Sequence, residues 1–371
     1  MSAPIRVLLL GYGLAGRIFH GRLITAEPDM QVTGIVTTDP ERRAQAQADM
    51  PDARIYDSLE QALQSSGDFD LVVVATANSA HVPQATAALE HGLPVVVDKP
   101  LAGTAAQAQR LVDLAEGRGL QLHVFQNRRW DSEILTARRL IDDGTLGRVH
   151  RLESRFERWR PQPKGGWRET GGADDLPGLL YDLGAHLVDQ ALHLLGPVEA
   201  VVASVRAVRD GMQTDDDTQV MLWHTSGALS ILSVSSVAGS IEPRLRVLGT
   251  RGSLEITGLD TQEDALRAGA SPLDADWGIE AGPAYLVTAD DPRPRAIDRD
   301  RGAWATYYRG VAAALRGEAT APVDARDVVA NLRVIGRDEE GRARLDTPVG
   351  IERGGPGTQG VLLRVQAGDL Q

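Results

Sequence analysis

The chain has 371 residues, 51 acidic and 39 basic side chains and a formal net charge of −12. This length allows two domains with separate hydrophobic cores, and the negative balance argues against nucleic acid or an anionic membrane surface as the main partner. Because the sequence contains no cysteine, disulfides, thiolate catalysis and cysteine-ligated metals are excluded.

The N-terminal residues 1–4 lead directly into an apolar stretch, without the charged segment and hydrophobic core of a signal peptide. No apolar run approaches the roughly 20 residues that a membrane span requires. We therefore expect a cytoplasmic protein that has no membrane partner.

A glycine-rich turn follows the first predicted strand, residues 5–10, and precedes a predicted helix over residues 17–26. The turn supplies Gly11, Gly13, Leu14, Ala15 and Gly16 in the pattern G-x-G-x-x-G. In this context the glycines permit a tight turn, the approach of a pyrophosphate and close packing of helix on strand. The alternative is a purely structural turn, and the flanking strand and helix favour dinucleotide binding.

The second predicted strand, residues 31–37, ends where an acidic residue would hold the ribose hydroxyls of NAD. The sequence instead has Thr37 and Thr38, followed by Arg42 and Arg43, which match the 2′-phosphate of NADP better. Asp39 is near enough to act as the NAD-type acid, and the arginines also fit a solvated first helical turn. We expect NADP as the favoured cofactor, with NAD as the alternative.

Polar residues also follow the predicted strand over residues 71–75. Thr76, Asn78 and His81 lie at this strand's carboxyl end, where parallel α/β sheets bind ligands, and are expected to face the cofactor. A helix N-cap at Asn78 and a helix-start position for His81 are the structural alternatives.

The apolar run over residues 95–97 ends in Asp98, Lys99 and Pro100. A short run of β-branched residues fits a buried strand of a parallel sheet, so Lys99 is predicted to stand at the ligand-binding edge. Farther on, residues 126–131 break the pattern after the last predicted strand of this domain, 120–125. Asn127 and Arg128 are candidate substrate ligands, whereas a helix start capped by Asp131 is the alternative reading.

Beyond residue 148 the pattern changes to strands separated by turns, which indicates an α+β domain with a largely antiparallel sheet. The predicted strands cover residues 149–159, 198–208, 218–224, 228–237, 245–248 and 253–256. Residues 260–299 are poorly patterned, 301–316 and 325–335 are predicted helices, and the tail is irregular apart from a candidate strand at 361–365.

Asp182 and His186 lie four positions apart and would share one face of a helix. A carboxylate beside an imidazole raises its basicity, which suits a histidine that exchanges a proton with a hydroxyl group. An ordinary pair on a helix surface is the alternative. The sequence shows no convincing metal-ligand cluster, so no metal is expected.

The motifs in this order, together with Trp167-Arg168 and Gly171-Gly172, resemble the glucose-fructose oxidoreductase, inositol dehydrogenase and MocA (Gfo/Idh/MocA) family. The stretches at residues 11–20, 127–131 and 160–161 are most similar to a bacterial subgroup that contains NADP-dependent scyllo-inositol dehydrogenases. Asp98 stands where the family usually has glutamate, Ala77 where it usually has proline, and the tail after residue 335 departs from the family pattern.

The resemblance implies a Rossmann-type doubly wound parallel sheet in residues 1–125, an α+β domain with an open-faced sheet in 126–335, and an atypical tail in 336–371. It implies that Lys99 lies near nicotinamide and substrate, that His186 is the acid and base with Asp182 supporting it, and that Trp167 and Arg168 contact the cofactor. Homo-oligomerisation through the open sheet face is also implied.

We therefore expect hydride transfer between NAD(P) and a hydroxyl carbon of a polyol or sugar, an inositol being the subgroup's substrate. Lys99 would stabilise charge on the substrate oxygen while His186 exchanges its proton. A nucleotide-binding sensor without catalysis is the alternative of a different class, and an imine or tetrapyrrole substrate is a third reading.

Overall fold

The computed structural model describes residues 3–172, 175–240, 242–336 and 361–362. The chain packs into two compact units, of which the first contains residues 1–131, 261–278 and 302–329, and the second the remaining segments. This division differs from a simple cut between residues 125 and 126, because two later segments return to the first unit. The predicted tail, 336–371, lies almost entirely outside the described residues.

The first unit is built on a six-stranded parallel sheet in the order β3-β2-β1-β4-β5-β6. Its central strands are continuous apolar runs with almost no exposed surface, as expected for strands covered on both faces. The strands are β1 (Ile5–Leu10), β2 (Met30–Val36), β3 (Arg54–Tyr56), β4 (Leu71–Val74), β5 (Val95–Asp98) and β6 (Leu122–Phe125). The predicted Rossmann-type doubly wound parallel sheet is confirmed.

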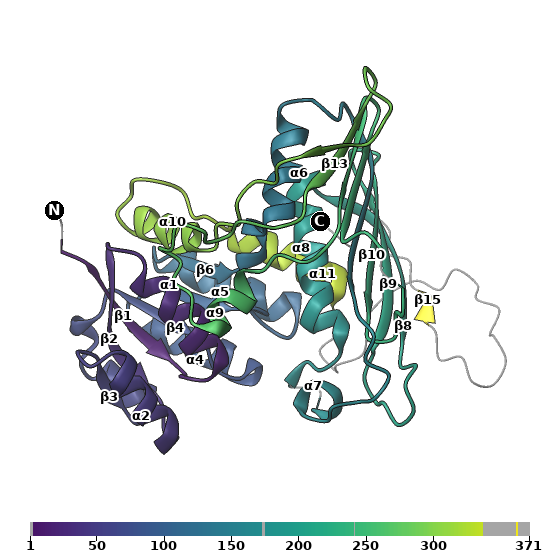
Figure 1. Cartoon of the computed structure of the whole chain (residues 1–371). Coiled ribbons are helices and arrows are strands. Elements are labelled where there is room, and N and C mark those ends of the chain that lie inside the picture. Colours follow the sequence, from purple (N-terminus) through teal and green to yellow (C-terminus); the bar gives the residue numbers. More distant parts are fainter. Residues whose placement is uncertain (1–2, 173–174, 241, 337–360, 363–371) are drawn as a thin grey trace. The chain divides into compact units, whose positions relative to one another are not determined.

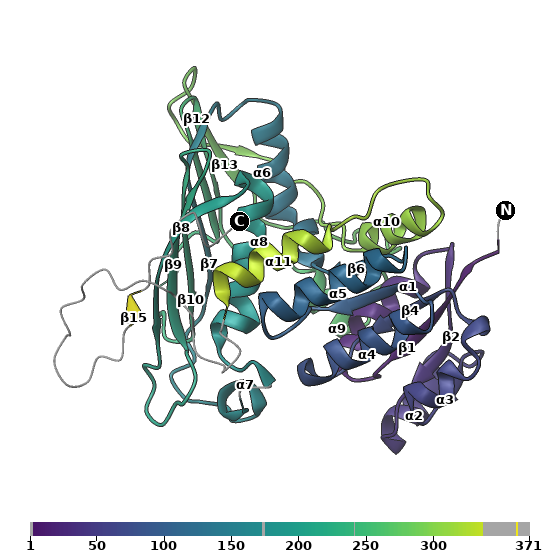
Figure 2. The same cartoon turned by 180° about the vertical axis from the view of Figure 1, so that it is seen from behind.

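The strand order reverses between β1 and β4, and right-handed crossovers then place helices on opposite faces of the sheet. Figure 2 shows α4 and α5 together on the side seen from behind. The helices of this unit are α1 (Arg22–Thr25), α2 (Pro40–Asp49), α3 (Leu59–Leu63), α4 (Asn78–Glu90), α5 (Ala105–Gly117), α9 (Gln262–Ala268) and α10 (Ala305–Leu315). Short 3₁₀ segments cover Ser66–Asp68 and Asn127–Trp130.

The helix predicted for residues 17–26 differs from expectation in its first half. A π-helical segment, Ala15–Gly21, follows the glycine turn directly and continues into α1. At the start of α4 the N-cap is Ala77, with extended backbone, so the alternative of Asn78 as N-cap is wrong.

The second unit contains a nine-stranded sheet in the order β14-β13-β12-β11-β7-β10-β9-β8-β15 (Figure 1). The strands are β7 (Val149–Glu157), β8 (Val198–Arg206), β9 (Asp217–His224), β10 (Leu229–Ser235), β11 (Leu245–Gly249), β12 (Gly252–Ile256), β13 (Ala284–Thr288), β14 (Arg295–Ile297) and β15 (Val361–Leu362). Only the β7–β10 pairing is parallel, which confirms a largely antiparallel sheet.

Two helices, α6 (Ser132–Asp142) and α8 (Ala185–Leu195), pack together and contact one face of this sheet through α8. The unit also contains α7 (Trp167–Thr170) and a π-helical turn, Leu180–Gly184, while α11 (Ala325–Ile335) begins in the first unit and ends in the second. The poorly patterned residues 260–299 contain the helix α9 and the strands β13 and β14, none of which the sequence predicted.

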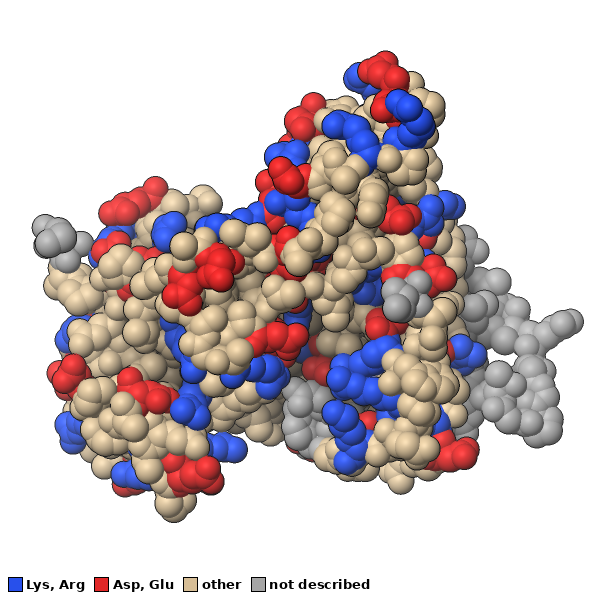
Figure 3. Space-filling model, in the orientation of Figure 1, with Lys and Arg blue, Asp and Glu red and all other residues tan. Residues whose placement is uncertain are grey.

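No helix in the described parts of the chain combines the length and the apolar character needed to cross a membrane. Figure 3 shows basic side chains lying close to acidic ones over much of the face in view, as expected for an acidic protein with both charge types on its surface.

Candidate active site

The glycine turn has the shape that a dinucleotide pyrophosphate requires. Gly11 has a φ of +89°, and a Cβ there would lie 2.5 Å from the Ala75 carbonyl oxygen; a Cβ on Gly16 would lie 2.0 Å from the Gly11 carbonyl oxygen. Backbone packing therefore requires both glycines. The atoms nearest to a Cβ on Gly13 would belong to the Arg42 guanidinium, with Nη1 at 3.6 Å, so the backbone leaves Gly13 open to a ligand.

The helical segment that starts at Ala15 presents no acidic residue in its first turn, and Leu14 before it is exposed. An anion near this helix start would meet backbone amides and the positive end of the helix dipole without an opposing carboxylate. The residues present therefore fit a nicotinamide dinucleotide.

The two arginines after β2 differ in their partners. Arg43 forms an ion pair with Asp57 and donates to the Thr37 carbonyl oxygen at 3.1 Å. The exposed Arg42 makes no hydrogen bond or ion pair through its guanidinium to any residue that the structure describes. The Asp39 carboxylate accepts the Arg42 backbone N–H at 2.9 Å and thereby caps α2. Thr38 is exposed beside it, whereas Thr37 is buried.

The residues predicted after β4 are tied to the loop after β5. The buried His81 ring has Nδ1 2.8 Å from the Pro100 carbonyl oxygen and Nε2 3.2 Å from the Thr76 carbonyl oxygen. The Thr76 hydroxyl donates to Gln84 at 2.7 Å. Asn78 opens α4 at the same edge. In the structure His81 joins two ligand-edge loops, and its contact with a cofactor stays a prediction.

Lys99 follows the last residue of β5 and is half-buried, and its peptide bond to Pro100 is cis. Its backbone N–H donates to Asp98 Oδ1 at 2.8 Å. Burial raises the pKa of Asp98, but its interactions with His20, His81 and Lys99 outweigh that effect and hold the pKa below its usual range. Lys99 therefore stands beside an ionised carboxylate.

Two buried side chains that the sequence did not indicate, His20 and Tyr308, lie next to Asp98 and to each other. His20 Nε2 is 3.7 Å from Asp98 Oδ2, and His20 Nδ1 is 2.6 Å from the Tyr308 hydroxyl of α10. Both His20 and Tyr308 are fully buried. The only sequence signal is a histidine within a helix that follows the glycine turn, and nothing local links it to residue 308.

Arg128 is already engaged within the first unit. Its guanidinium forms an ion pair with Glu263 of α9 at 2.6 Å and lies 3.4 Å from Asp131, while Asp131 accepts the Trp304 indole N–H at 2.8 Å. The neighbouring Asn127 is buried. These contacts give Arg128 a structural role, and its predicted contact with substrate stays untested.

In the second unit, Asp182 lies in the π-helical turn and His186 in the first turn of α8. His186 is buried and Asp182 half-buried. The start of this turn is fixed by Asp215, whose carboxylate accepts the Leu180 N–H at 2.8 Å and the Thr218 hydroxyl at 2.9 Å. The structure thus brings Asp182 and His186 onto one continuous helical segment, as the spacing predicted.

Trp167 and Arg168 begin the short helix α7, and their side chains lie outside the described residues. The backbone of this helix is held by Glu169, which forms an ion pair with Arg209 at 3.0 Å. Arg209 also pairs with the buried Asp216 at 2.7 Å. The predicted sites thus fall into two groups, one in each compact unit, with Lys99 in the first and His186 in the second.

Two family models match the chain, one in each of its two parts. Residues 5–126 match the oxidoreductase family with an NAD-binding Rossmann fold, and residues 134–255 match the GFO/IDH/MocA C-terminal domain. The chain is 35% identical over 336 residues to scyllo-inositol 2-dehydrogenase (NADP(+)) of Bacillus subtilis, covering 89% of this chain and 92% of that protein. It is 30% identical to inositol 2-dehydrogenase 2 of Saccharopolyspora erythraea, covering 83% and 86%.

Two solved structures have the same architecture. That of yvaA from Bacillus subtilis is 35% identical and covers 90% of this chain and 95% of its own, with a TM-score of 0.85. That of YPO2259 from Yersinia pestis is 36% identical and covers 90% and 93%, with a TM-score of 0.83. The fold and the site define an oxidoreductase with a nicotinamide-dinucleotide domain. The chain belongs to the Gfo/Idh/MocA family, which confirms the resemblance of its motifs.

Proposed function

We propose that the protein is an NADP-dependent dehydrogenase that acts on a hydroxyl carbon of a polyol, with an inositol as the first candidate. The observation that carries the proposal is the edge at the ends of β1, β4 and β5. An open glycine turn and Lys99 beside an ionised carboxylate lie at this edge, and the Arg42 guanidinium, which has no hydrogen-bond or ion-pair partner among the described residues, lies next to the turn. The relatives that act on inositols support the choice of substrate.

Several residues of the first unit would hold the cofactor. Gly13 and the start of the following helix would receive the pyrophosphate, and Arg42 would bind the 2′-phosphate that distinguishes NADP from NAD. When bound, the cofactor supplies a nicotinamide carbon that takes up or releases a hydride. The chain's own residues supply charge, orientation and proton transfer.

Lys99 carries an ammonium group on a flexible stem that begins at the sheet edge. In alcohol oxidation this group would donate to the substrate oxygen and stabilise the negative charge that develops there. His186 would accept the hydroxyl proton, and Asp182, four residues earlier on the same helical segment, would stabilise the imidazolium that results. In carbonyl reduction the same groups work in reverse.

The direct test measures absorbance at the nicotinamide band while inositols and aldoses are offered with NADP and with NAD. Lys99→Met is expected to lower kcat by a factor of at least about 100, since one charge-stabilising donor is lost, with unchanged affinity for NADP. Lys164→Met is the matched control, because Lys164 is the chain's other lysine and lies exposed in a loop. Near-normal turnover by the Lys99 variant contradicts the assignment.

A second pair of variants tests the histidine. His186→Ala is expected to lower kcat and to remove the rise in oxidation rate with pH that follows loss of its proton. His193→Ala, on the same helix α8, serves as control. Tight nucleotide binding without turnover of any polyol, sugar or other carbonyl compound would instead support a sensor.

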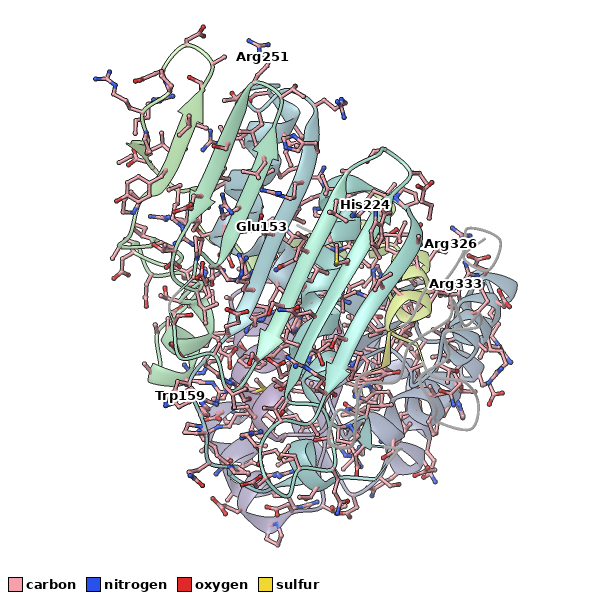
Figure 4. The ribbon with its side chains drawn as sticks, turned by 90° about the vertical axis from the view of Figure 1, so that its right-hand side faces the viewer. Glu153, Trp159, His224, Arg251, Arg326 and Arg333 are labelled. Atoms are coloured by element: carbon pink, nitrogen blue, oxygen red, sulfur yellow. The ribbon has the colours of Figure 1, made fainter. Side chains whose placement is uncertain are left out.

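We also propose that the protein self-associates through the open face of the second-unit sheet. Figure 4 shows this face with no described helix in front of it. Glu153 lies at its centre and pairs with Arg151, Arg155 and Arg246. Trp223 of β9, two strands away, is 36% exposed. Aromatic and arginine side chains, both present on this face, are enriched at protein interfaces. Trp223→Glu should lower the sedimentation mass, and an unchanged mass would contradict this interface.

A further inference from the structure

The most unusual buried polar group of the first unit is a chain of three side chains that ends at the lysine loop. Tyr308 of α10, His20 of the first helical segment and Asp98 of β5 follow one another, with 2.6 Å between the Tyr308 hydroxyl and His20 Nδ1 and 3.7 Å between His20 Nε2 and Asp98 Oδ2. Asp98 then accepts the Lys99 N–H through its other oxygen, at 2.8 Å. The chain thus connects two segments 288 residues apart to the backbone of Lys99.

The hydrogen positions in this chain follow from the groups present. Burial, together with the negative charges of Tyr307 and Asp98, raises the pKa of Tyr308 well above its ordinary value, so its hydroxyl keeps its proton. We assign this hydroxyl as the donor to His20 Nδ1, because the Asp98 carboxylate, which can only accept, lies on the Nε2 side of the ring. The imidazole then carries its own proton on Nε2, which faces the Asp98 carboxylate. Every proton in the chain points toward Asp98, an arrangement that favours its ionised form.

Apolar packing fixes the imidazole in this position. The His20 ring lies 4.3 Å from the Phe125 ring, centroid to centroid, and meets Tyr308 edge-on at 6.1 Å. Phe125 is also the β6 partner of Asp98 in the sheet. Since none of these rings is exposed, the carboxylate lacks water on this side and faces the His20 imidazole instead, with His20 Nε2 3.7 Å from Oδ2.

We propose that His20 and Tyr308 are positioning residues for Lys99: they hold the Asp98 carboxylate ionised and oriented, and Asp98 in turn fixes the backbone of Lys99 and places a negative charge beside its ammonium group. This inference rests on the proposed function, in which Lys99 binds the substrate oxygen. It assigns a role to residues that contact neither the substrate nor the cofactor.

Other ionisable groups also face Asp98 and bear on any pH effect. They come from each element around it: His20 from the first helical segment, His81 from α4, Lys99 from the loop after β5, and Tyr307 and Tyr308 from α10. His81 is tied to two carbonyl oxygens, whereas His20 faces the carboxylate directly.

The kinetic test uses His20→Phe, which keeps a ring of similar size in the apolar site. In the reduction direction, where His186 works in its protonated form, wild-type kcat is expected to stay level as the pH falls from about 7 to about 5. In the variant, His20 no longer offsets the effect of burial, so the pKa of Asp98 rises and its carboxylate becomes protonated as the pH falls. The variant should therefore lose activity across this range, with a kcat about tenfold lower near pH 5 and unchanged affinity for NADP. Asp98→Asn should lower kcat at every pH, and His20→Phe should add nothing to it.

Two matched controls separate positioning from simple loss of stability. His123→Phe replaces another fully buried histidine of this unit, whose Nε2 faces Gln121 instead of Asp98. Tyr307→Phe removes a buried hydroxyl that has no hydrogen-bond partner within the described chain, whereas Tyr308→Phe removes the donor to His20. Only the His20 and Tyr308 variants should change the pH profile; equal changes in the controls would overturn the inference.

A measurement without substrate keeps this inference distinct from the proposed function. In ¹⁵N spectra of the histidines, the signal lost in His20→Phe should show the tautomer with the proton on Nε2, and Asp98→Asn should shift it. The opposite tautomer, or no shift in Asp98→Asn, would overturn the inference. Failure of wild-type protein to oxidise any polyol would overturn the proposed function and leave the imidazole result intact.

Discussion

Replacement of Arg42 offers the sharpest test of the cofactor assignment. Arg42 has no ion pair or hydrogen bond through its guanidinium within the described chain, and this group lies 3.6 Å from the position of a Cβ on Gly13. Arg42→Ala therefore removes no hydrogen bond or ion pair between described residues, and we expect the free energy of unfolding to change by less than about 0.5 kcal/mol.

The effect on binding follows from the contact that is lost. A hydrogen bond between charged groups contributes about 1.5–3 kcal/mol, which corresponds to a 10- to 150-fold higher Kd for NADP at about 1.4 kcal/mol per tenfold. The Kd for NAD, which lacks the 2′-phosphate, should change less than about threefold. Fluorescence titration of reduced cofactor at two salt concentrations measures both values, and the NADP effect should shrink at higher salt.

Two further variants sharpen the interpretation. Arg43→Ala removes the ion pair with Asp57 and should lower the affinity for NADP and for NAD equally, because it disturbs the loop and not a phosphate contact. Asp39→Asn keeps a good helix cap but removes a charge, so it should leave NAD affinity unchanged if Arg42 is the determinant. Equal losses for NADP and NAD in Arg42→Ala, or a selective loss of NAD in Asp39→Asn, would refute the assignment.

The remaining predictions concern the turn, a buried histidine and a buried ion pair. Gly13→Ala should keep the melting temperature but lower the affinity for both NADP and NAD. Gly16→Ala should lower the melting temperature, because its Cβ would lie 2.0 Å from the Gly11 carbonyl oxygen. Equal melting temperatures for the two variants would contradict this. Burial lowers the pKa of His123 to about 4, below the unfolded value of about 6.5, so the unfolded chain binds more protons between these pH values. The free energy of unfolding should therefore fall by about 3 kcal/mol as the pH drops from about 6.5 to about 4. A flatter dependence of unfolding on pH in His123→Phe checks it, and an unchanged dependence would refute it. Glu133→Ala leaves two buried guanidinium groups uncompensated and should cost about 3–5 kcal/mol in chemical denaturation, against at most about 1 kcal/mol for the exposed Glu255→Ala; similar costs would contradict the difference.

Much of the first unit could be predicted because its signals are local. Continuous apolar runs mark β1, β4 and β5, and the glycines mark the turn between β1 and the first helical segment. Boundary errors occur where the last turn or strand end depends on a neighbour: β6 begins at Leu122, two residues after the predicted start. Propensity alone does not fix such ends.

The elements between residues 260 and 299 were missed for a physical reason. The helix α9 buries only Gln262 and Leu266, so it lacks an apolar stripe. Gln262 is held instead by distant backbone groups, accepting the Trp304 N–H at 2.8 Å and donating to the Trp130 carbonyl oxygen at 3.2 Å. Likewise, the strand β14 has only three residues and pairs with β13 alone. Tertiary contacts stabilise these elements, and the local sequence carries no pattern from which they could be predicted.

The candidate site shows the same difference between pattern and packing. Adjacent arginines are equivalent in sequence, yet Arg43 is held by Asp57 while Arg42 lies beside the glycine turn, and Arg128, which also reads as a ligand candidate, is bound to Glu263. A guanidinium that is already paired within the fold, as in Arg43 and Arg128, is less available to a ligand than one that is not. Motif spacing can therefore locate a candidate site, as at Lys99. Which of the nearby charged side chains can bind a ligand depends on partners distant in the chain, and variants at those partners test the function most directly.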